Sequence, residues 1–261
     1  MRKAAVVSAG AILVVSILLI GVMSRNGTTV VEFEGFTVRS IAIENVNVHL
    51  VTAGDNSFLV EAGDRSSFEH IVSEIRAAGV EPSSLRAVVV THGHADHFGG
   101  AKSFKDEFNV PVIGGRGDLA QFQSGRSGEL CPTSSFVRIF LEKKSNARTA
   151  PPFTPDILIS ETISTKDLLG FDGEIVPLPG HTKGSIVINL GEAAFVGDLF
   201  RGGVLSPTSA QTHFYMCDLQ DNESDVGHLL HSISANATHF FTGHMGPVSR
   251  QSVISHFAPP E

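Results

Sequence analysis

The sequence contains no run of five or more basic residues, and its 27 Asp and Glu outnumber its 19 Lys and Arg. The formal net charge at pH 7 is −8. Nucleic-acid binding depends mainly on neutralising phosphate charges with Lys and Arg. We therefore expect no nucleic acid as a partner, and we attribute the acidic balance to solubility.

Cysteine is also scarce, since Cys131 and Cys217 are the only two. They could form a disulfide in an oxidising compartment, but many proteins keep two free thiols. A disulfide requires a specific placement of the two Cβ atoms, which a sequence does not supply. Their pairing is therefore left open at this point.

Only one long apolar run is present. Ala4 to Met23 carries no charge and, at about 1.5 Å per helical residue, spans roughly the 30 Å of a bilayer's hydrocarbon core. Arg2 and Lys3 precede it, so the positive-inside tendency places the N-terminus in the cytoplasm and the following chain outside. We expect residues 1–25 to form an uncleaved signal anchor, that is, one transmembrane helix. A signal peptide cleaved near Ser24, which would give a secreted protein, is the alternative.

Four potential metal ligands crowd into six positions directly after the apolar run Ala87 to Val90: His92, His94, Asp96 and His97. If the backbone leaves a strand still extended, the first two histidines point to the same side and one ion can take both. A turn at Ala95 would swing the other two to a second position close by. Clustered His and Asp are the usual form of N/O metal sites, which favours a metal centre over a histidine-rich loop that serves only solubility.

Three later segments offer further ligands. His181 lies in Pro-Gly-His-Thr-Lys-Gly-Ser, Asp198 in Val-Gly-Asp-Leu-Phe and His244 in Thr-Gly-His-Met-Gly, and each segment follows or ends an apolar run. With the first motif, these segments resemble the metallo-β-lactamase superfamily, in the expected order over residues 36–257. The resemblance implies an α/β fold, the four-layer αβ/βα sandwich, formed here by one domain over residues 36–261 after a linker at residues 26–35.

The resemblance also implies a role for each motif residue. One ion would be held by His92, His94 and His181, the other by Asp96, His97 and His244, with Asp198 bridging the two. Two cations that share a carboxylate can lower the pKa of a shared water toward neutrality, so a bridging hydroxide could attack an ester, lactone, thioester or related bond. Asp96 and Asp198 are then the candidate catalytic residues. Imidazole with carboxylate suits zinc first, with iron or manganese possible.

Other functions remain open on the same residues. The best known β-lactamases with this first motif carry Cys where this chain has Asp198. The glyoxalase II group shares the bridging Asp, but its basic substrate-binding segment near the C-terminus is not found here, and lactonases stay open. Persulfide dioxygenases are similar at His-Ala-Asp-His and would hold one iron through His92, His181 and Asp198. A catalytically silent binding module normally lacks one or more of the ligands.

Weaker candidates lie elsewhere in the chain. His213 follows Asp198 in a segment expected to overhang the site, and it is the candidate for contact with a small-molecule substrate. His228 and His231 stand three apart on a predicted helix, a spacing more typical of a polar helix face. Residues 124–155 are rich in Ser, Gly, Pro and basic residues. We interpret them as a partly helical insertion, with a helix over 136–144, that flanks the metal site.

Apolar patterning predicts two halves, each of strands followed by helices. The predicted strands are residues 37–43, 46–51, 57–60, 110–113, 174–176, 185–190, 193–196 and 238–242. The predicted helices are residues 66–78, capped by Asp64, a segment after Gly100, and residues 118–122 and 223–234.

Overall fold

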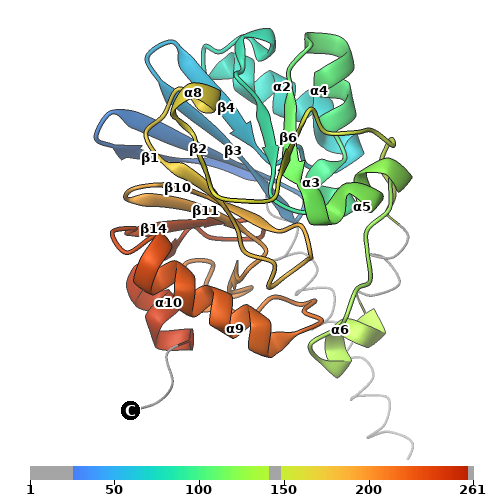
Figure 1. Cartoon of the computed structure of the whole chain (residues 1–261), viewed down its shortest axis with the longest axis vertical. Helices are drawn as coiled ribbons and strands as arrows, with labels where there is room; N and C mark the ends of the chain where they lie inside the picture. The colour runs from blue at the N-terminus through green and yellow to red at the C-terminus, as the bar shows by residue number, and fades with distance from the viewer. Residues whose placement is uncertain (1–25, 141–147, 258–261) are drawn as a thin grey trace, which may run out of the picture.

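The structure is a computed structural model that describes residues 26–140 and 148–257 (Figure 1). The expected anchor at residues 1–25 lies outside these ranges and stays a prediction. Within the described ranges, no helix is long and apolar enough to cross a membrane.

The first sheet has seven strands in sequential order along the sheet. They are β1 (Gly27–Phe33), β2 (Phe36–Ile43), β3 (Val46–Ala53), β4 (Asn56–Val60), β5 (Val88–Val90), β6 (Val112–Gly115) and β7 (Ile157–Ile159). The first four strands are joined by antiparallel hairpins, whereas β4 to β7 run parallel to one another. The parallel strands need crossovers, which are supplied by α2 (Phe68–Ala77), α4 (Ala101–Phe108) and α5 (Leu119–Ser124).

The second sheet has six strands in the order β15-β14-β11-β10-β9-β8. They are β8 (Ile163–Ser164), β9 (Glu174–Pro177), β10 (Ile186–Leu190), β11 (Ala193–Gly197), β14 (His239–Thr242) and β15 (Val248–Ser249). β11 and β14 are parallel neighbours. Helix α9 (Leu219–His228) and the π-helical turn η4 (Leu229–Ile233) connect toward β14, and α10 (Arg250–Phe257) follows β15.

Three apolar clusters fill the spaces between the four layers of the fold, which are helices, the first sheet, the second sheet and helices. One joins α2 and α4 to the outer face of the first sheet, with Phe68, Ile71 and Phe104 buried in it. A second fills the space between the two sheets, and a third lies between the second sheet and the helices α9 and α10. Figure 1 shows α2 and α4 on one side of the paired sheets and α9 and α10 on the other. The predicted αβ/βα sandwich is confirmed.

Local sequence explains where the helices begin and end. The carboxylate of Asp64 accepts a hydrogen bond from the Ser66 backbone at 3.0 Å, but it caps the short 3-10 turn η1 (Arg65–Ser67) that leads into α2, whose own N-cap is Ser67. The helix predicted from residue 223 begins earlier, at Leu219, because Asp218 caps it through the Asp221 backbone N–H. Its last turn widens into η4.

The structure also differs from the sequence prediction in its first strand, in β6 and in the insertion helix. Residues 26–35, expected to be a linker, contain β1, which pairs along its whole length with β2. Its Thr-Thr-Val-Val core favours a strand, but its exposed edge position weakens the apolar signal. The strand predicted at 110–113 shifts to Val112–Gly115, and the insertion helix is α6 (Ser135–Phe140), with residues 141–147 outside the described ranges.

The two sheets are joined directly beside the expected site. The Ile186 backbone N–H donates to the carbonyl of Thr91 at 2.9 Å, and the Asn47 backbone N–H donates to the carbonyl of Gly243 at 2.7 Å. These bonds fix the end of β5 against β10 and the start of β3 against the segment after β14. The segments that carry the predicted ligands therefore meet at one edge of the sandwich.

Candidate metal centre

The seven predicted ligands come from four segments that follow strands or join them. His92 and His94 lie in the loop after β5, and Asp96 and His97 lie on the single-turn helix α3 (Ala95–Phe98). The remaining three side chains lie between β9 and β10, after β11 and after β14: His181, Asp198 and His244. The structure brings all seven together, as the sequence predicted.

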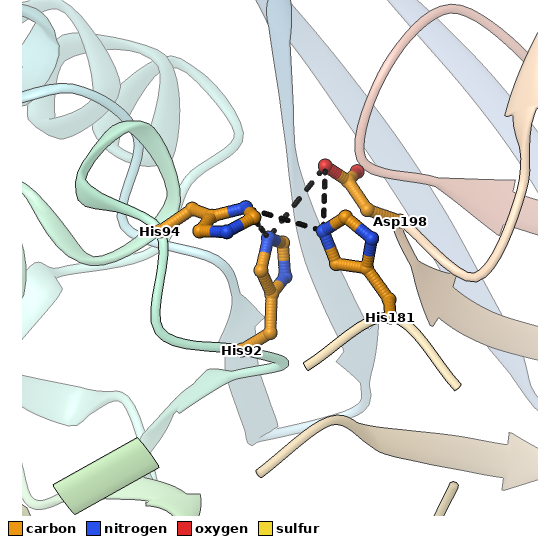
Figure 2. Close-up of side chains that lie close together, drawn as sticks. All are labelled: His92, His94, His181 and Asp198. Carbon is orange, nitrogen blue, oxygen red and sulfur yellow. Dashed lines mark hydrogen bonds and ion pairs between the residues drawn. The ribbon is translucent and has the colours of Figure 1, made fainter. Parts of the chain in front are cut away.

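The first ligand group is formed by His92, His94, His181 and Asp198, whose rings and carboxylate converge in Figure 2. The Nδ1 atom of His94 lies 3.1 Å from Nε2 of His92 and 3.1 Å from Nε2 of His181. Oδ2 of Asp198 lies 3.6 Å from Nε2 of His92 and 3.7 Å from Nε2 of His181. All four side chains are buried.

The second group is formed by Asp96, His97 and His244. The two imidazole planes lie at 82° to each other with their Nε2 atoms 3.3 Å apart, and Oδ2 of Asp96 lies 4.0 Å from Nε2 of His244. Asp198 belongs to this group as well, because its Oδ2 lies 3.3 Å from His97 and 3.2 Å from His244. The carboxylate therefore stands between the two groups.

These separations fit metal coordination. Two ligand atoms that each lie about 2.0–2.1 Å from a tetrahedral ion are roughly 3.3 Å apart, and the observed values scatter around that figure. Both oxygens of Asp198, the carboxylate shared by the two groups, are buried without a hydrogen-bond partner in the described part of the chain. Such atoms cost about 1–3 kcal/mol each when left unsatisfied, so the donor set fits a cation in each group.

The electrostatics point the same way. Burial lowers the pKa of His92 and His181 well below the usual value, and it lowers that of His94 to about 4. These rings are therefore neutral near pH 7, which is the form that binds metal. Burial alone would lower the pKa of His97 as well, but the carboxylates of Asp198 and Glu61 raise it well above its usual value. A cation on Nε2 of His97 would take the place of that nitrogen's proton beside Asp198, while a proton on Nδ1 would stay with Glu61.

Glu61 is a further residue of the candidate site, and the sequence analysis missed it. It follows β4, and its Oε1 lies 3.3 Å from Nδ1 of His97, while its other oxygen accepts from the Thr91 backbone at 3.2 Å. A carboxylate on the far nitrogen fixes the orientation of a metal-binding imidazole. An acidic residue that ends the apolar run of β4 was the available signal, but only the pairing of β4 with β5 brings it to the ligands.

Arg148 pairs with Asp96 through Nη1 and Oδ2. Burial would raise the pKa of Asp96, but the charges of His97 and Arg148 outweigh it and lower the pKa to about 2. Asp96 is thus fully ionised at neutral pH. Arg148 lies in the insertion at residues 124–155, so this contact agrees with the expectation that the insertion flanks the site.

A buried carboxylate, Asp118, ties the two histidine loops together. Its Oδ2 accepts from the Gly93 backbone and from the Thr182 hydroxyl, both at 2.6 Å, and its Oδ1 accepts from the Gly184 backbone at 3.0 Å. A Cβ at Gly93 would lie 2.8 Å from that of Asp118, so the first loop needs glycine for this approach. Asp118 thereby positions the loops of His92, His94 and His181, although it belongs to none of the groups of described residues that could hold a metal ion.

Replacing Asp118 with Asn should lower turnover by about 10–100-fold, because groups that orient metal ligands from outside the coordination sphere commonly contribute that much. The amide nitrogen would face at least one of the three donors, which leaves a buried N–H or O–H unsatisfied. Metal content and thermal unfolding should be measured with turnover. Asp167→Asn, at an exposed position on α8 (Lys166–Leu169), is the matched control. Unaltered turnover and metal content in the Asp118 variant would contradict the positioning role.

The remaining histidine predictions have different outcomes. His213 reaches the centre, where its Nε2 lies 3.1 Å from Oδ2 of Asp198 and its side chain is buried. Whether it contacts substrate stays a prediction. His228 and His231 are exposed and belong to none of the ligand groups found among the described residues. The structure agrees with the interpretation that these two histidines belong to a polar helix face and not to a metal site.

Cys131 and Cys217, whose pairing the sequence left open, form a disulfide with an S–S distance of 2.01 Å and Cα atoms 4.9 Å apart. The bond joins the insertion to the segment that carries His213. The backbone supports the same junction, since the Met216 N–H donates to the carbonyl of Cys131 at 2.8 Å.

Comparison with known proteins agrees with the motif analysis. The sequence model of the metallo-beta-lactamase superfamily matches residues 42–238, and the chain belongs to this superfamily. A hydroxyacylglutathione hydrolase of Haemophilus influenzae is 29% identical over 153 residues, which cover 57% of this chain and 64% of that protein. A beta-lactamase-like protein 2 homolog of Drosophila melanogaster is 24% identical over 187 residues, which cover 70% of this chain and 56% of that protein. The matches span less than two thirds of these relatives.

Solved structures show the same fold. A metallo-beta-lactamase of Cronobacter sakazakii with a HARLDQ motif has a TM-score of 0.60 at 19% identity, covering 87% of this chain and 81% of that one. A metallo-beta-lactamase family protein of Thermus thermophilus has a TM-score of 0.61 at 20% identity, covering 85% of this chain and 78% of that one. At such identities the likeness concerns the fold alone.

Proposed function

We propose that this protein is a two-metal hydrolase that cleaves an ester, lactone, thioester or related bond of a small molecule. The observation that carries the proposal is the position of Asp198. One carboxylate lies within 3.2–3.7 Å of imidazoles from both ligand groups, as a ligand shared by two ions would. Zinc is the first candidate for both ions, and iron or manganese would also suit the donors.

The roles of the side chains follow from this arrangement. A bound pair of divalent ions would supply an activated water and polarise the oxygen under attack. His92, His94 and His181 would hold one ion, Asp96, His97 and His244 the other, and Asp198 both. Glu61 and Asp118 orient these ligands, and the buried setting of the imidazoles limits the access of competing water. No Ser or Cys nucleophile is needed for such a reaction.

Thioesters are the first substrates to test. Two of the relatives, from Anaeromyxobacter dehalogenans and Dechloromonas aromatica, are also hydroxyacylglutathione hydrolases, at 26% and 25% identity. This chain keeps an aspartate between its two ligand groups, as the sequence resemblance to the glyoxalase II group implies. β-Lactam cleavage is an alternative activity, with support from the fold alone.

A one-iron oxidoreductase of the persulfide dioxygenase type is the alternative from another reaction class. The three residues that it would use, His92, His181 and Asp198, do converge on one point. The presence of a complete second group favours the hydrolase, because a one-iron enzyme would leave His97 and His244 without a partner ion.

Metal analysis together with a substrate panel tests the proposal. The purified 261-residue chain should contain about two equivalents of zinc or a similar ion, and chelation should abolish hydrolysis. The panel should contain a hydroxyacyl thioester of glutathione, a lactone, a simple ester, a phosphodiester and a β-lactam. One equivalent of iron with oxygen uptake on a persulfide would replace the hydrolase with the dioxygenase.

We further propose that the domain faces an oxidising compartment outside the cytoplasm, held there by residues 1–25. The Cys131–Cys217 disulfide supports this location, since such bonds persist mainly in oxidising environments. Protease added to cells with a permeable outer layer should digest the domain, and alkaline carbonate should leave the protein in the membrane. Protection from protease would overturn the orientation, and release by carbonate would favour cleavage of the segment.

A further inference from the structure

Two polar side chains of α9 contact the backbone next to predicted metal ligands. They are Asn222, which is completely buried, and Asp225, which is partly buried. They stand three positions apart in the helix, so both lie on the same face. Neither belongs to a ligand group among the described residues. Their polar atoms therefore need an explanation other than direct metal binding.

Asn222 holds the segment that follows the shared carboxylate. Its Nδ2 atom donates to the backbone carbonyl of Leu199 at 2.8 Å, and Leu199 comes directly after Asp198. The Oδ1 atom of Asn222 is buried without a hydrogen-bond partner in the described part of the chain. An unsatisfied buried acceptor costs about 1–3 kcal/mol, so stability alone would favour an apolar side chain here. The bond to Leu199 is what the amide provides in return.

Asp225 holds the loop of His181. Its Oδ2 atom accepts from the backbone N–H of Gly180 at 2.7 Å, and Gly180 directly precedes His181. A Cβ at Gly180 would lie 2.8 Å from Cα of Asn222 and 3.0 Å from Oδ2 of Asp225. The loop therefore packs directly against the helix, and glycine permits this close approach.

The helix can serve as a fixed support because it is itself held at its start and along its apolar face. The Asp218 carboxylate accepts from the Asp221 backbone N–H at 2.9 Å, which caps the first turn. Val226 and Leu229 are buried in the apolar cluster between α9 and the second sheet, and Leu199 belongs to the same cluster. The loop and the segment that bond to α9 are thus held at a fixed place relative to each other.

We propose that Asn222 and Asp225 are positioning residues that set the place of the shared carboxylate, Asp198, relative to the first ligand group. Asp118 joins the loop of His181 to that of the first two histidines, and α9 joins it to the segment of Asp198. This inference rests on the proposed two-metal function. Asp225 acts on a ligand of one ion, whereas Asn222 acts on the ligand of both. Replacing them should therefore affect the two ions differently.

Cadmium binding by the metal-free full-length chain tests this difference without a substrate. Titration against a competing chelator measures the two affinities, and ¹¹³Cd NMR shows which ion is bound, since His94→Ala should remove the resonance of the first group. Asp225→Ala should lower the affinity for the ion held by His181 by about 10–100-fold and leave the other affinity unchanged. Asn222→Ala should lower both affinities, because Asp198 lies beside imidazoles of both groups.

Two further variants separate positioning from a general loss of stability. Asp225→Asn keeps an acceptor oxygen for the Gly180 N–H and should recover most of the affinity. Glu223→Ala, which removes an exposed acid from the same helix, is the matched control and should bind both ions as the wild type does. If Asn222→Ala does not fold, the Asp225 variants decide the question.

Three results would count against the proposal. Equal losses for both ions in Asp225→Ala would show a general disturbance of the site. Unchanged affinities in Asp225→Ala, or in a folded Asn222→Ala, would show that the contacts with α9 do not position the ligands. A wild-type protein that binds a single cadmium ion would instead contradict the two-metal function, and this inference with it.

Discussion

Replacing Asp198 with Asn should reduce hydrolysis by more than about 100-fold and lower the metal content well below two equivalents. Residues that only orient metal ligands commonly account for about 10–100-fold, and a ligand shared by two ions should exceed them. Asn keeps the volume and one oxygen but removes the negative charge. That charge matters because burial would raise the pKa of Asp198, whereas His213, His244 and His97 lower it well below its usual value.

Metal content by elemental analysis, turnover and far-UV circular dichroism should be compared for this variant and the wild type. Asp221→Asn is the matched control, because Asp221 is an exposed aspartate in the first turn of α9. It should keep both metal and activity. An Asp198→Asn protein that binds two ions and turns over normally would show that the carboxylate does not bridge the centre.

The second large effect concerns stability. Replacing Cys131 and Cys217 together with Ser should lower the free energy of unfolding by about 4–5 kcal/mol. In the chain-entropy description this is the value for a loop of 86 residues, the separation of the two cysteines. Native-state relaxation can reduce the effect, but measured losses for native disulfides are typically about 2–5 kcal/mol.

Chemical denaturation of the oxidised wild type, the reduced wild type and the double variant measures this effect. The two proteins without the bond should unfold at the same lower denaturant concentration, and reductant should not shift the double variant. Because the bond joins the insertion to the segment of His213, limited proteolysis should cut that segment faster once the bond is absent. Equal unfolding midpoints with and without the bond would contradict the prediction.

The candidate ligand residues could be identified from sequence because the pattern that marks them is local. Three histidines and an aspartate after one apolar strand, and three later His or Asp residues at strand ends, are recognisable without coordinates. Strand ends in neighbouring strands share one edge of a sheet, so their loops meet there. The same reasoning predicted α2, whose buried Phe68, Ile71, Val72 and Ile75 follow helical spacing.

Elements with a weak local signal were predicted less well. β1 is an exposed edge strand, and its pairing with β2 depends on the neighbouring strand more than on its own residues. α9 begins four residues before its predicted start because Asp218 acts as its cap. The disulfide could only be left open, since Cys131 and Cys217 come from segments that no local pattern brings together.

The sequence by itself determined the superfamily, the four-layer architecture and the identity of the seven candidate ligands, because these depend on motifs and on apolar periodicity along the chain. Only the tertiary structure decided which other side chains surround those ligands. Glu61 reaches His97 through the pairing of β4 with β5, and Asp118 joins two loops from different sheets. The direction of His213 toward Asp198 depends on contacts with the insertion. Such contacts join residues far apart in the chain, so their geometry exists only after both sheets have packed together.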